Sequence, residues 1–270
     1  GNKIGEVGYN LKGIATVTRQ KYLTASEKGP WANSYDRWRN DNLTNRYQGV
    51  QFGYTSAGRY TSWNDIWNYY GFKERDVLPG DYKYEDWNGD GEINGQDEHP
   101  FAFDQTPWLQ FSLNAGLQWK NFDFNMLLQG SALGSMEYKE PLHEIWGKNG
   151  GGALTQFLDR WHPVDPKADP YDPSTVWTSG HYAYTGRWAK NNSAFNRVST
   201  AYLRLKSIEL GYTFPKLKQI PNASLRVYAN AYNLLTFTGV KFVDPEHPDD
   251  DLGRMYPLNK TYTLGVSLSF

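Results

Sequence analysis

The chain has 270 residues, and its net charge of −1 gives no electrostatic basis for binding nucleic acid. It contains no cysteine, which excludes a disulfide framework and a thiolate metal site. The mean hydropathy is −0.72, and no run approaches the roughly 18 apolar residues that a membrane helix requires. A helical membrane protein is therefore excluded, whereas a membrane protein built of strands, which mix apolar with polar residues, is not.

Six segments show the alternation of a β-strand with one apolar and one polar face. In 109–119 every odd position is apolar and every even position is polar or glycine, and 261–270 alternates in the same way with the opposite phase. Such segments of about 10 residues are typical of transmembrane β-barrels, in which the apolar face meets lipid and the polar face meets the lumen. The predicted strands are 4–18, 109–119, 122–132, 202–214, 225–235 and 261–270.

The fourth predicted strand changes phase along its length. Leu203 and Leu205 are apolar at odd positions, whereas Ile208 and Leu210 are apolar at even positions, so the apolar face slips near Lys206. We expect a β-bulge there, because one extra residue accounts for the slip.

The connections between the predicted strands fall into two lengths. Lys120-Asn121 is a two-residue hairpin turn, and Pro215 to Ser224 is a short turn bounded by proline. If neighbouring strands pair, both short turns lie at one end of the sheet and the long connections at the other, as in outer-membrane barrels with long extracellular loops. The long connections, all polar and rich in aromatic residues, are 19–108, 133–201 and 236–260.

The fold predicted from this pattern is all-β, a transmembrane antiparallel up-and-down β-barrel. Six strands do not close such a barrel, for which about 8 is the minimum, and open sheet edges are prohibitive in hydrocarbon. We therefore expect further strands on another polypeptide or on another part of a longer chain. A soluble β-sandwich or barrel with half-buried strands is the alternative, because one-face-buried antiparallel sheets show the same alternation.

The segment from Asp86 to Asp97 carries the clearest chemical motif. Numbered as a calcium loop, it places oxygen-bearing side chains at positions 1, 3, 5, 9 and 12, and a glycine at position 6, where the chain turns sharply. Such hard donors suit Ca²⁺ in a structural role, although Asp97 replaces the bidentate glutamate of EF-hands. The alternative is a hairpin turn that binds no ion. The candidate metal ligands are Asp86, Asn88, Asp90, Glu92 through its backbone carbonyl, and Asp97.

Tryptophan residues are concentrated in the first two long connections. Large amphipathic rings with few rotatable bonds make good recognition surfaces, and the apolar C–H faces of sugars are a natural ligand for them. For any one ring the alternative is packing between loops, because only a few interface residues dominate binding energy. The candidate substrate or partner residues are Trp31, Trp38, Trp63, Trp67, Trp161, Trp177 and Trp188.

Several ordered stretches resemble the last part of SusC-like TonB-dependent transporters, the large outer-membrane nutrient importers of Bacteroidetes. They are GDYKYEDWNGDGEIN at 80–94, WKNFDFNMLLQG at 119–130, AYLRLKSIELGYTFP at 201–215, LRVYANAYNLL at 225–235, Tyr256-Pro257 and the closing strand. The resemblance covers most of the chain. It implies that residues 1–270 are the C-terminal part of a barrel of about 22 strands, with the plug domain and the earlier strands outside this chain.

The resemblance also implies a function, which is active import of a nutrient through the outer membrane of a Gram-negative bacterium. The nutrient would be a glycan or, as a second choice, a peptide. The implied partners are the lipid bilayer, a SusD-like surface lipoprotein that closes the extracellular mouth, and TonB acting through the plug.

An enzyme is not expected, since the sequence has no G-x-S-x-G elbow, phosphate-binding loop or dinucleotide fingerprint. The rival from another class is a secreted, calcium-stabilised carbohydrate-binding or glycoside-hydrolase β-domain. It explains the aromatic content and the loop at Asp86 equally well, but it explains poorly why all the long connections share one end of the predicted sheet.

Overall fold

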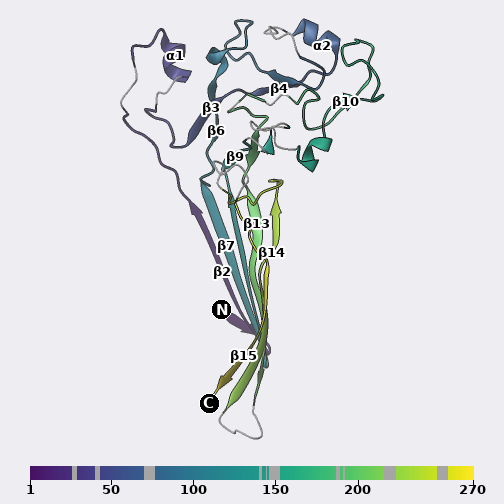
Figure 1. Cartoon of the computed structure of the whole chain (residues 1–270). Helices are drawn as coiled ribbons and strands as arrows, with labels where there is room; N and C mark the ends of the chain where they lie inside the picture. The colour runs from purple at the N-terminus through teal and green to yellow at the C-terminus, as the bar shows by residue number, and fades with distance from the viewer. Residues whose placement is uncertain are drawn as a thin grey trace.

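The computed structural model consists of one long sheet with a head of short strands and helices at one end (Figure 1). None of the described helices is long and apolar enough to cross a membrane. The residues described are 1–25, 29–39, 43–69, 77–139, 142–143, 145, 153–186, 189–190, 192–215, 223–247 and 255–270.

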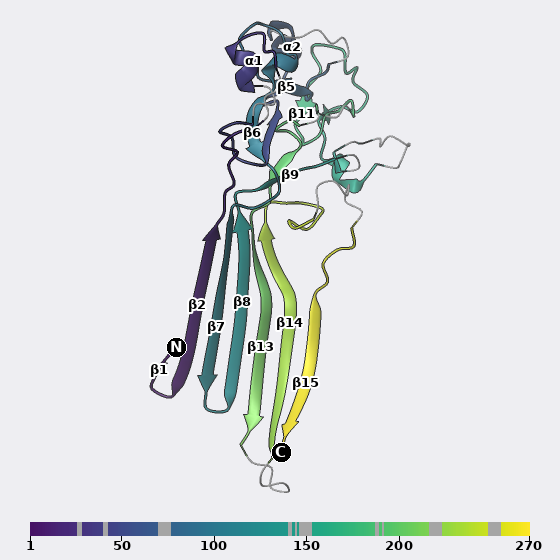
Figure 2. The same ribbon diagram turned by 90° about the vertical axis from the view of Figure 1, so that its left-hand side faces the viewer.

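The long sheet has seven antiparallel strands, and their order in space follows their order along the chain (Figure 2). All six predicted strands are present as neighbours, which confirms the up-and-down arrangement. The strands are β1 (Asn2–Ile4), β2 (Val7–Val17), β7 (Leu109–Trp119), β8 (Phe122–Ala132), β13 (Tyr202–Phe214), β14 (Ser224–Thr238) and β15 (Thr261–Ser269).

Two predicted boundaries were wrong. The predicted strand 4–18 is interrupted by a turn at Gly5 and Glu6, so that β1 folds back and pairs with the start of β2. Gly5 has φ +60°, a left-handed conformation that glycine adopts without steric cost and that alternation of side chains does not reveal. Strand β14 also runs past the predicted end at 235 to Thr238.

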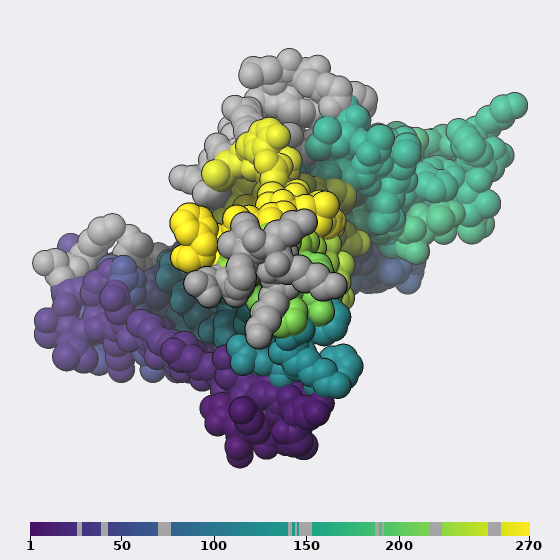
Figure 3. Space-filling view, turned by 90° about the horizontal axis from the view of Figure 1, so that it is seen from below, coloured from purple at the N-terminus to yellow at the C-terminus, as the bar shows by residue number. Residues whose placement is uncertain are grey.

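The long and short connections lie at opposite ends of the sheet, as predicted. The turn between β7 and β8, the last residues of β13 and the first residues of β14 lie at the end away from the head (Figure 2). The three long connections all leave from the other end, where the head stands. Seen from the short-turn end, parts of the head extend sideways beyond the strands (Figure 3).

The two faces of the sheet differ in character. The outer face carries the apolar side chains, and the described chain leaves many of them exposed: Leu264 is 85% exposed, Leu11 64% and Phe237 62%. The opposite, inner face carries polar residues that pair across strands, such as Ser112 with Gln129. A contiguous apolar face of this kind requires an apolar partner, and lipid fits the barrel pattern.

The predicted β-bulge is present. Strand β13 shifts register between Leu205 and Ser207 against both of its neighbours, β8 and β14. Because side chains alternate with period 2, the extra residue moves the inner face from even to odd positions. Arg204 before the bulge and Glu209 after it therefore lie on the same inner face, opposite Gln129 and Asn125 of β8.

The described part of the head contains four small two-stranded sheets and short helices. Tyr60, Ile66 and Val77 form one small core, and Ile145, Phe157 and Tyr182 another. The paired strands are β3 (Val50–Gly53) with β6 (His99–Phe103), β4 (Ser56–Arg59) with β5 (Tyr82–Tyr84), β9 (Ser135–Glu137) with β12 (Arg197–Ser199), and β10 (His162–Pro163) with β11 (Trp177–Thr178). The helices of the described residues include α1 (Ser34–Arg39), α2 (Trp63–Asn68), η1 (Gly95–Asp97) and η3 (Thr155–Leu158).

Candidate functional site

A charged cluster links three neighbouring strands on the inner face, toward the short-turn end. Arg226 of β14 donates from Nε to Asp123 of β8 at 3.1 Å and from Nη2 to Glu209 of β13 at 2.6 Å. The three side chains are about a quarter exposed. Each carboxylate thus has a guanidinium partner in a fixed fork geometry, which ties the wall together without placing an unpaired charge in it.

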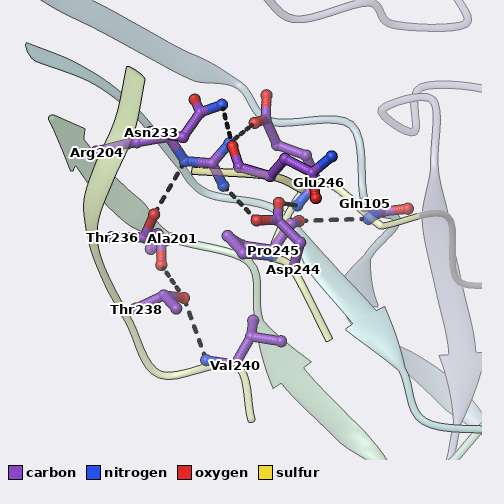
Figure 4. Close-up of polar contacts among 11 residues, drawn as sticks. Gln105, Ala201, Arg204, Asn233, Thr236, Thr238, Val240, Asp244, Pro245 and Glu246 are labelled. Atoms are coloured by element: carbon purple, nitrogen blue, oxygen red, sulfur yellow. Dashed lines mark hydrogen bonds and ion pairs between the residues drawn. The ribbon is translucent and has the colours of Figure 1, made fainter. Parts of the chain in front are cut away.

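A second arginine lies at the opposite end of the same face, where the sheet meets the head (Figure 4). Arg204 of β13 is fully buried. Its Nη1 donates to Glu246 at 2.7 Å, its Nη2 to Asp244 at 2.6 Å and its Nε to Thr236 at 3.1 Å. Both carboxylates belong to the segment 239–247 that follows β14, here called the strap. Arg204 therefore joins the wall to the strap in addition to bonding Thr236 of the neighbouring strand β14.

The strap forms one side of a pocket of about 680 Å³ on the inner face. Pro245 and Glu246 of the strap contribute to its lining, and the remainder comes from the wall, from the segment before β7 and from Thr200 just before β13. Among the described lining residues, Glu246 is the only one with a charged side chain. The hydroxyl and amide side chains that line the pocket are Thr16, Gln105, Thr106, Gln110, Ser112, Gln129, Ser131, Thr200 and Tyr202.

Sequence reasoning did not single out the residues of these clusters. A signal was present, because Asp123, Glu209 and Arg226 stand at polar-face positions of their strands, where a charge faces the lumen rather than lipid. Asp244 and Glu246 gave no such signal, since they lie in an aperiodic connection and meet Arg204 only through the path of the strap.

The predicted calcium loop is folded by hydrogen bonds between its own side chains and backbone. The carboxylate of Asp86 accepts hydrogen bonds from the backbone N–H groups of Gly89 and Gly91, both at 2.8 Å, and Gly91 at position 6 has φ +84°. Asp97 is buried and accepts from Trp87 N–H at 2.9 Å and from Asn94 N–H at 2.8 Å. These bonds fold the loop by themselves. Among the described residues no group of three or more His, Asp or Glu side chains converges to hold a metal ion.

Calcium binding by this loop stays a prediction, and terbium luminescence tests it. Tb³⁺ takes the same oxygen ligands as Ca²⁺, and Trp87 at the second loop position would sensitise its emission. We expect emission that Ca²⁺ displaces and that Asp86→Asn combined with Asp90→Asn removes, because affinity follows the number of charged ligands. Asp36→Asn, outside the loop, is the control. A loop that folds without an ion would give the same weak emission in all three proteins.

The predicted aromatic residues lie in the head but do not form one surface. Trp38 and Trp67 are exposed, whereas Trp63 packs against the core of Tyr60, Ile66 and Val77. Trp31, Trp161 and Trp177 are partly buried, and Trp188 lies outside the described residues. The exposed rings belong to two groups. In one, Trp38 stacks near Trp87, with 6.5 Å between the ring centroids. In the other, Trp67 and Tyr171 both contact Trp63.

The core formed by Ile145, Phe157 and Tyr182 contains a tyrosine whose pKa is shifted. Burial raises the pKa of the Tyr182 phenol to about 12, and the ring packs edge-on against Phe157 at 4.5 Å. The folded head thus favours the neutral phenol, so the contribution of Tyr182 to stability is complete below the ordinary pKa of tyrosine and declines as pH rises from 10 toward 12. A structural role in packing, not proton transfer, fits this environment.

Comparisons with known proteins place this geometry in context. No family model matches the chain. TonB-dependent receptor P3 of Formosa agariphila is 28% identical over 211 residues, which are 72% of this chain and 19% of that protein. TonB-dependent receptor SusC of Bacteroides thetaiotaomicron is 26% identical over 210 residues, 77% of this chain and 19% of that protein. The chain thus spans about a fifth of the length of these relatives.

Solved structures show the same fold. The RagAB peptide importer in its 'closed-closed' state matches with a TM-score of 0.62 and 17% identity, over 100% of this chain and 28% of that chain. The RagAB peptide transporter matches with a TM-score of 0.51 and 20% identity, over 82% of this chain and 22% of that chain.

A two-faced antiparallel sheet with all its long connections at one end defines a segment of an outer-membrane β-barrel wall. The relatives support the resemblance drawn from the sequence: the chain is similar to part of the SusC-like TonB-dependent receptors of the outer membrane, which are transporters rather than enzymes.

Proposed function

We propose that this chain forms part of the wall and extracellular head of an active importer of glycans. The observation that supports glycans is the lining of the inner-face pocket, which consists mainly of hydroxyl and amide groups with one charged side chain, Glu246. Such groups hydrogen-bond the hydroxyls of a neutral sugar chain, and a carboxylate accepts two of them. A peptide carries a charged carboxyl terminus, for which the described lining offers no cationic partner.

The proposal includes the partners implied by the resemblance. TonB would supply energy through a plug domain, and a SusD-like surface lipoprotein would cover the head. Among the seven tryptophans predicted as contact residues, the exposed rings of Trp38 and Trp67 are best suited to contact that partner or the glycan, because partly buried rings such as Trp177 have little free face.

Growth on defined nutrients tests this function. A strain lacking the gene is expected to lose growth on one neutral polysaccharide in a panel of plant, algal and microbial glycans, while growth on glucose and on a peptide digest is unchanged. Reintroducing the full-length gene should restore it. Loss of growth on the peptide digest alone would reject the glycan in favour of a peptide, and unchanged growth on every nutrient would reject nutrient import.

A further inference from the structure

The strap borders the inner-face pocket. It leaves the wall at the end of β14, its Asp244 and Glu246 meet Arg204 of β13 (Figure 4), and its Pro245 and Glu246 line the pocket. The rest of the lining is made mainly by β-strands, together with residues 105–107 and Thr200, whereas the strap consists of nine residues without regular structure.

Polar contacts hold the strap in place. Besides Arg204, Gln105 donates from its side-chain amide to the backbone carbonyls of Pro245 and His247. The Tyr138 hydroxyl donates to Lys241 O at 2.9 Å and accepts from Lys241 N at 2.8 Å. Val240 is buried at the start of the strap and Pro245 and His247 are buried near its end, whereas Phe242 between them is 55% exposed. The apolar burial that fixes a permanent element is thus small along the middle of the strap.

The ion pairs of Arg204 fix the position of the strap, but they contribute little net free energy to holding it closed. A buried guanidinium persists only with counter-charges, and the attraction between the groups is largely offset by their lost hydration. When the strap lifts, Arg204, Asp244 and Glu246 all return to water in the lumen. The closed arrangement is therefore well defined, yet it opens at a low cost.

Backbone strain lies in the same segment. Phe242 has φ +72°, a left-handed conformation that is unusual for a bulky side chain. Residues held in such conformations are found where a structure switches between states. Opening of the strap would let Phe242 relax to an ordinary conformation.

From these observations we propose that the strap is a gate over the inner-face pocket, and that Arg204 is the latch that holds it closed. The closed gate narrows the lumen and supplies Glu246 to the pocket, and release from Arg204 uncovers the wall residues beneath. The proposal rests on the proposed function only in treating the pocket as part of the import path.

The test measures how fast a thiol in the pocket reacts with an impermeant maleimide in cells that carry the full-length transporter. This chain has no cysteine, so Ser112→Cys adds the only thiol within it, and the parent without that change supplies the background. With the latch intact we expect slow labelling. Arg204→Gln should make labelling about tenfold faster, which corresponds to roughly 1.4 kcal/mol less free energy of opening.

Two further variants keep the test decisive. Asp244→Asn with Glu246→Gln removes the charges from the strap alone, so it decides the question if Arg204→Gln does not fold, and it should also speed labelling. Arg226→Gln removes an arginine that is likewise paired with two carboxylates but joins only strands of the wall, so it should leave labelling unchanged. Heat-modifiable migration in SDS gels verifies folding of each variant.

Two results would overturn the gate. One is labelling at the parental rate in folded Arg204→Gln and in the strap variant. The other is equal acceleration by Arg226→Gln, which would mean general loosening of the wall. Because labelling requires no transported nutrient, failure of glycan import in the growth test leaves this result intact, and the reverse also holds.

Discussion

Arginine in place of Leu264 is expected to prevent assembly of the barrel, whereas arginine at the adjacent Thr263 is tolerated. Leu264 stands in the middle of β15 on the outer face and is 85% exposed, so lipid is its expected surrounding. Arginine at the bilayer midplane costs about 2–4 kcal/mol on the lipid face of a barrel. Thr263 lies opposite Asn230 on the inner face, where water hydrates a new charge.

Comparing the two variants tests only the face of the sheet, because both introduce arginine and the two positions lie at nearly the same depth in the membrane. The fraction of folded transporter in outer-membrane preparations, read from heat-modifiable gel migration, should fall strongly for Leu264→Arg and little for Thr263→Arg. Urea titration of the folded protein in lipid vesicles gives the free energy. Equal loss in both variants would contradict the assignment of outer and inner faces to β15.

Alanine in place of Gly53 should unfold part of the head while the wall remains folded. A Cβ at Gly53 would lie 1.6 Å from the carbonyl oxygen of Asn192 and 2.8 Å from the ring of Phe101. The crossing segment is held by Tyr54 N–H donating to Asn192 O and by Ala194 N–H donating to Tyr54 O, both at 3.0 Å. Overpacking and loss of these two bonds together cost about 2–4 kcal/mol.

Hydrogen exchange followed by mass spectrometry provides the readout for Gly53→Ala. Peptides that contain Ala194 should exchange faster, whereas peptides from β7 and β8 should keep their protection. Gly95→Ala is the matched control in the same head, because its Cβ would meet no atom within 4 Å. Unchanged exchange around Ala194 would show that the two segments do not cross as closely as described.

Local pattern predicted the wall because lipid and lumen impose a strict period of two on each strand. Strands β7 and β8 match their predicted bounds at both ends, since alternation is unbroken and Lys120-Asn121 is a recognisable hairpin turn. The slip of phase at Lys206 likewise identified the bulge. The reversal at Gly5 was missed because a single residue with positive φ leaves almost no trace in hydrophobic pattern.

The structure of the head and the ion pairs of Arg204 could not be predicted from the sequence, for a different reason. Contacts such as Arg204 with Asp244 join residues 40 positions apart and depend on the path of an aperiodic segment. The same holds for β3 and β6, which pair across a long polar connection without regular alternation. For the aromatic residues, composition identified the right region, but only tertiary packing separates the exposed Trp67 from Trp63 beside it.

The bulge at Lys206 has a consequence for how this strand can change in evolution. It divides β13 into two segments of opposite phase, so that deleting one residue between Arg204 and the bulge, or between the bulge and Glu209, would turn one segment inside out wherever the bulge is kept. Arg204 would then face lipid, or Glu209 would. Natural length variation in β13 should therefore come in steps of two residues, or be matched by a compensating change at Asn233 and Leu234 of β14, which lie opposite the bulge. Comparing the length of this strand among natural variants would test that expectation directly.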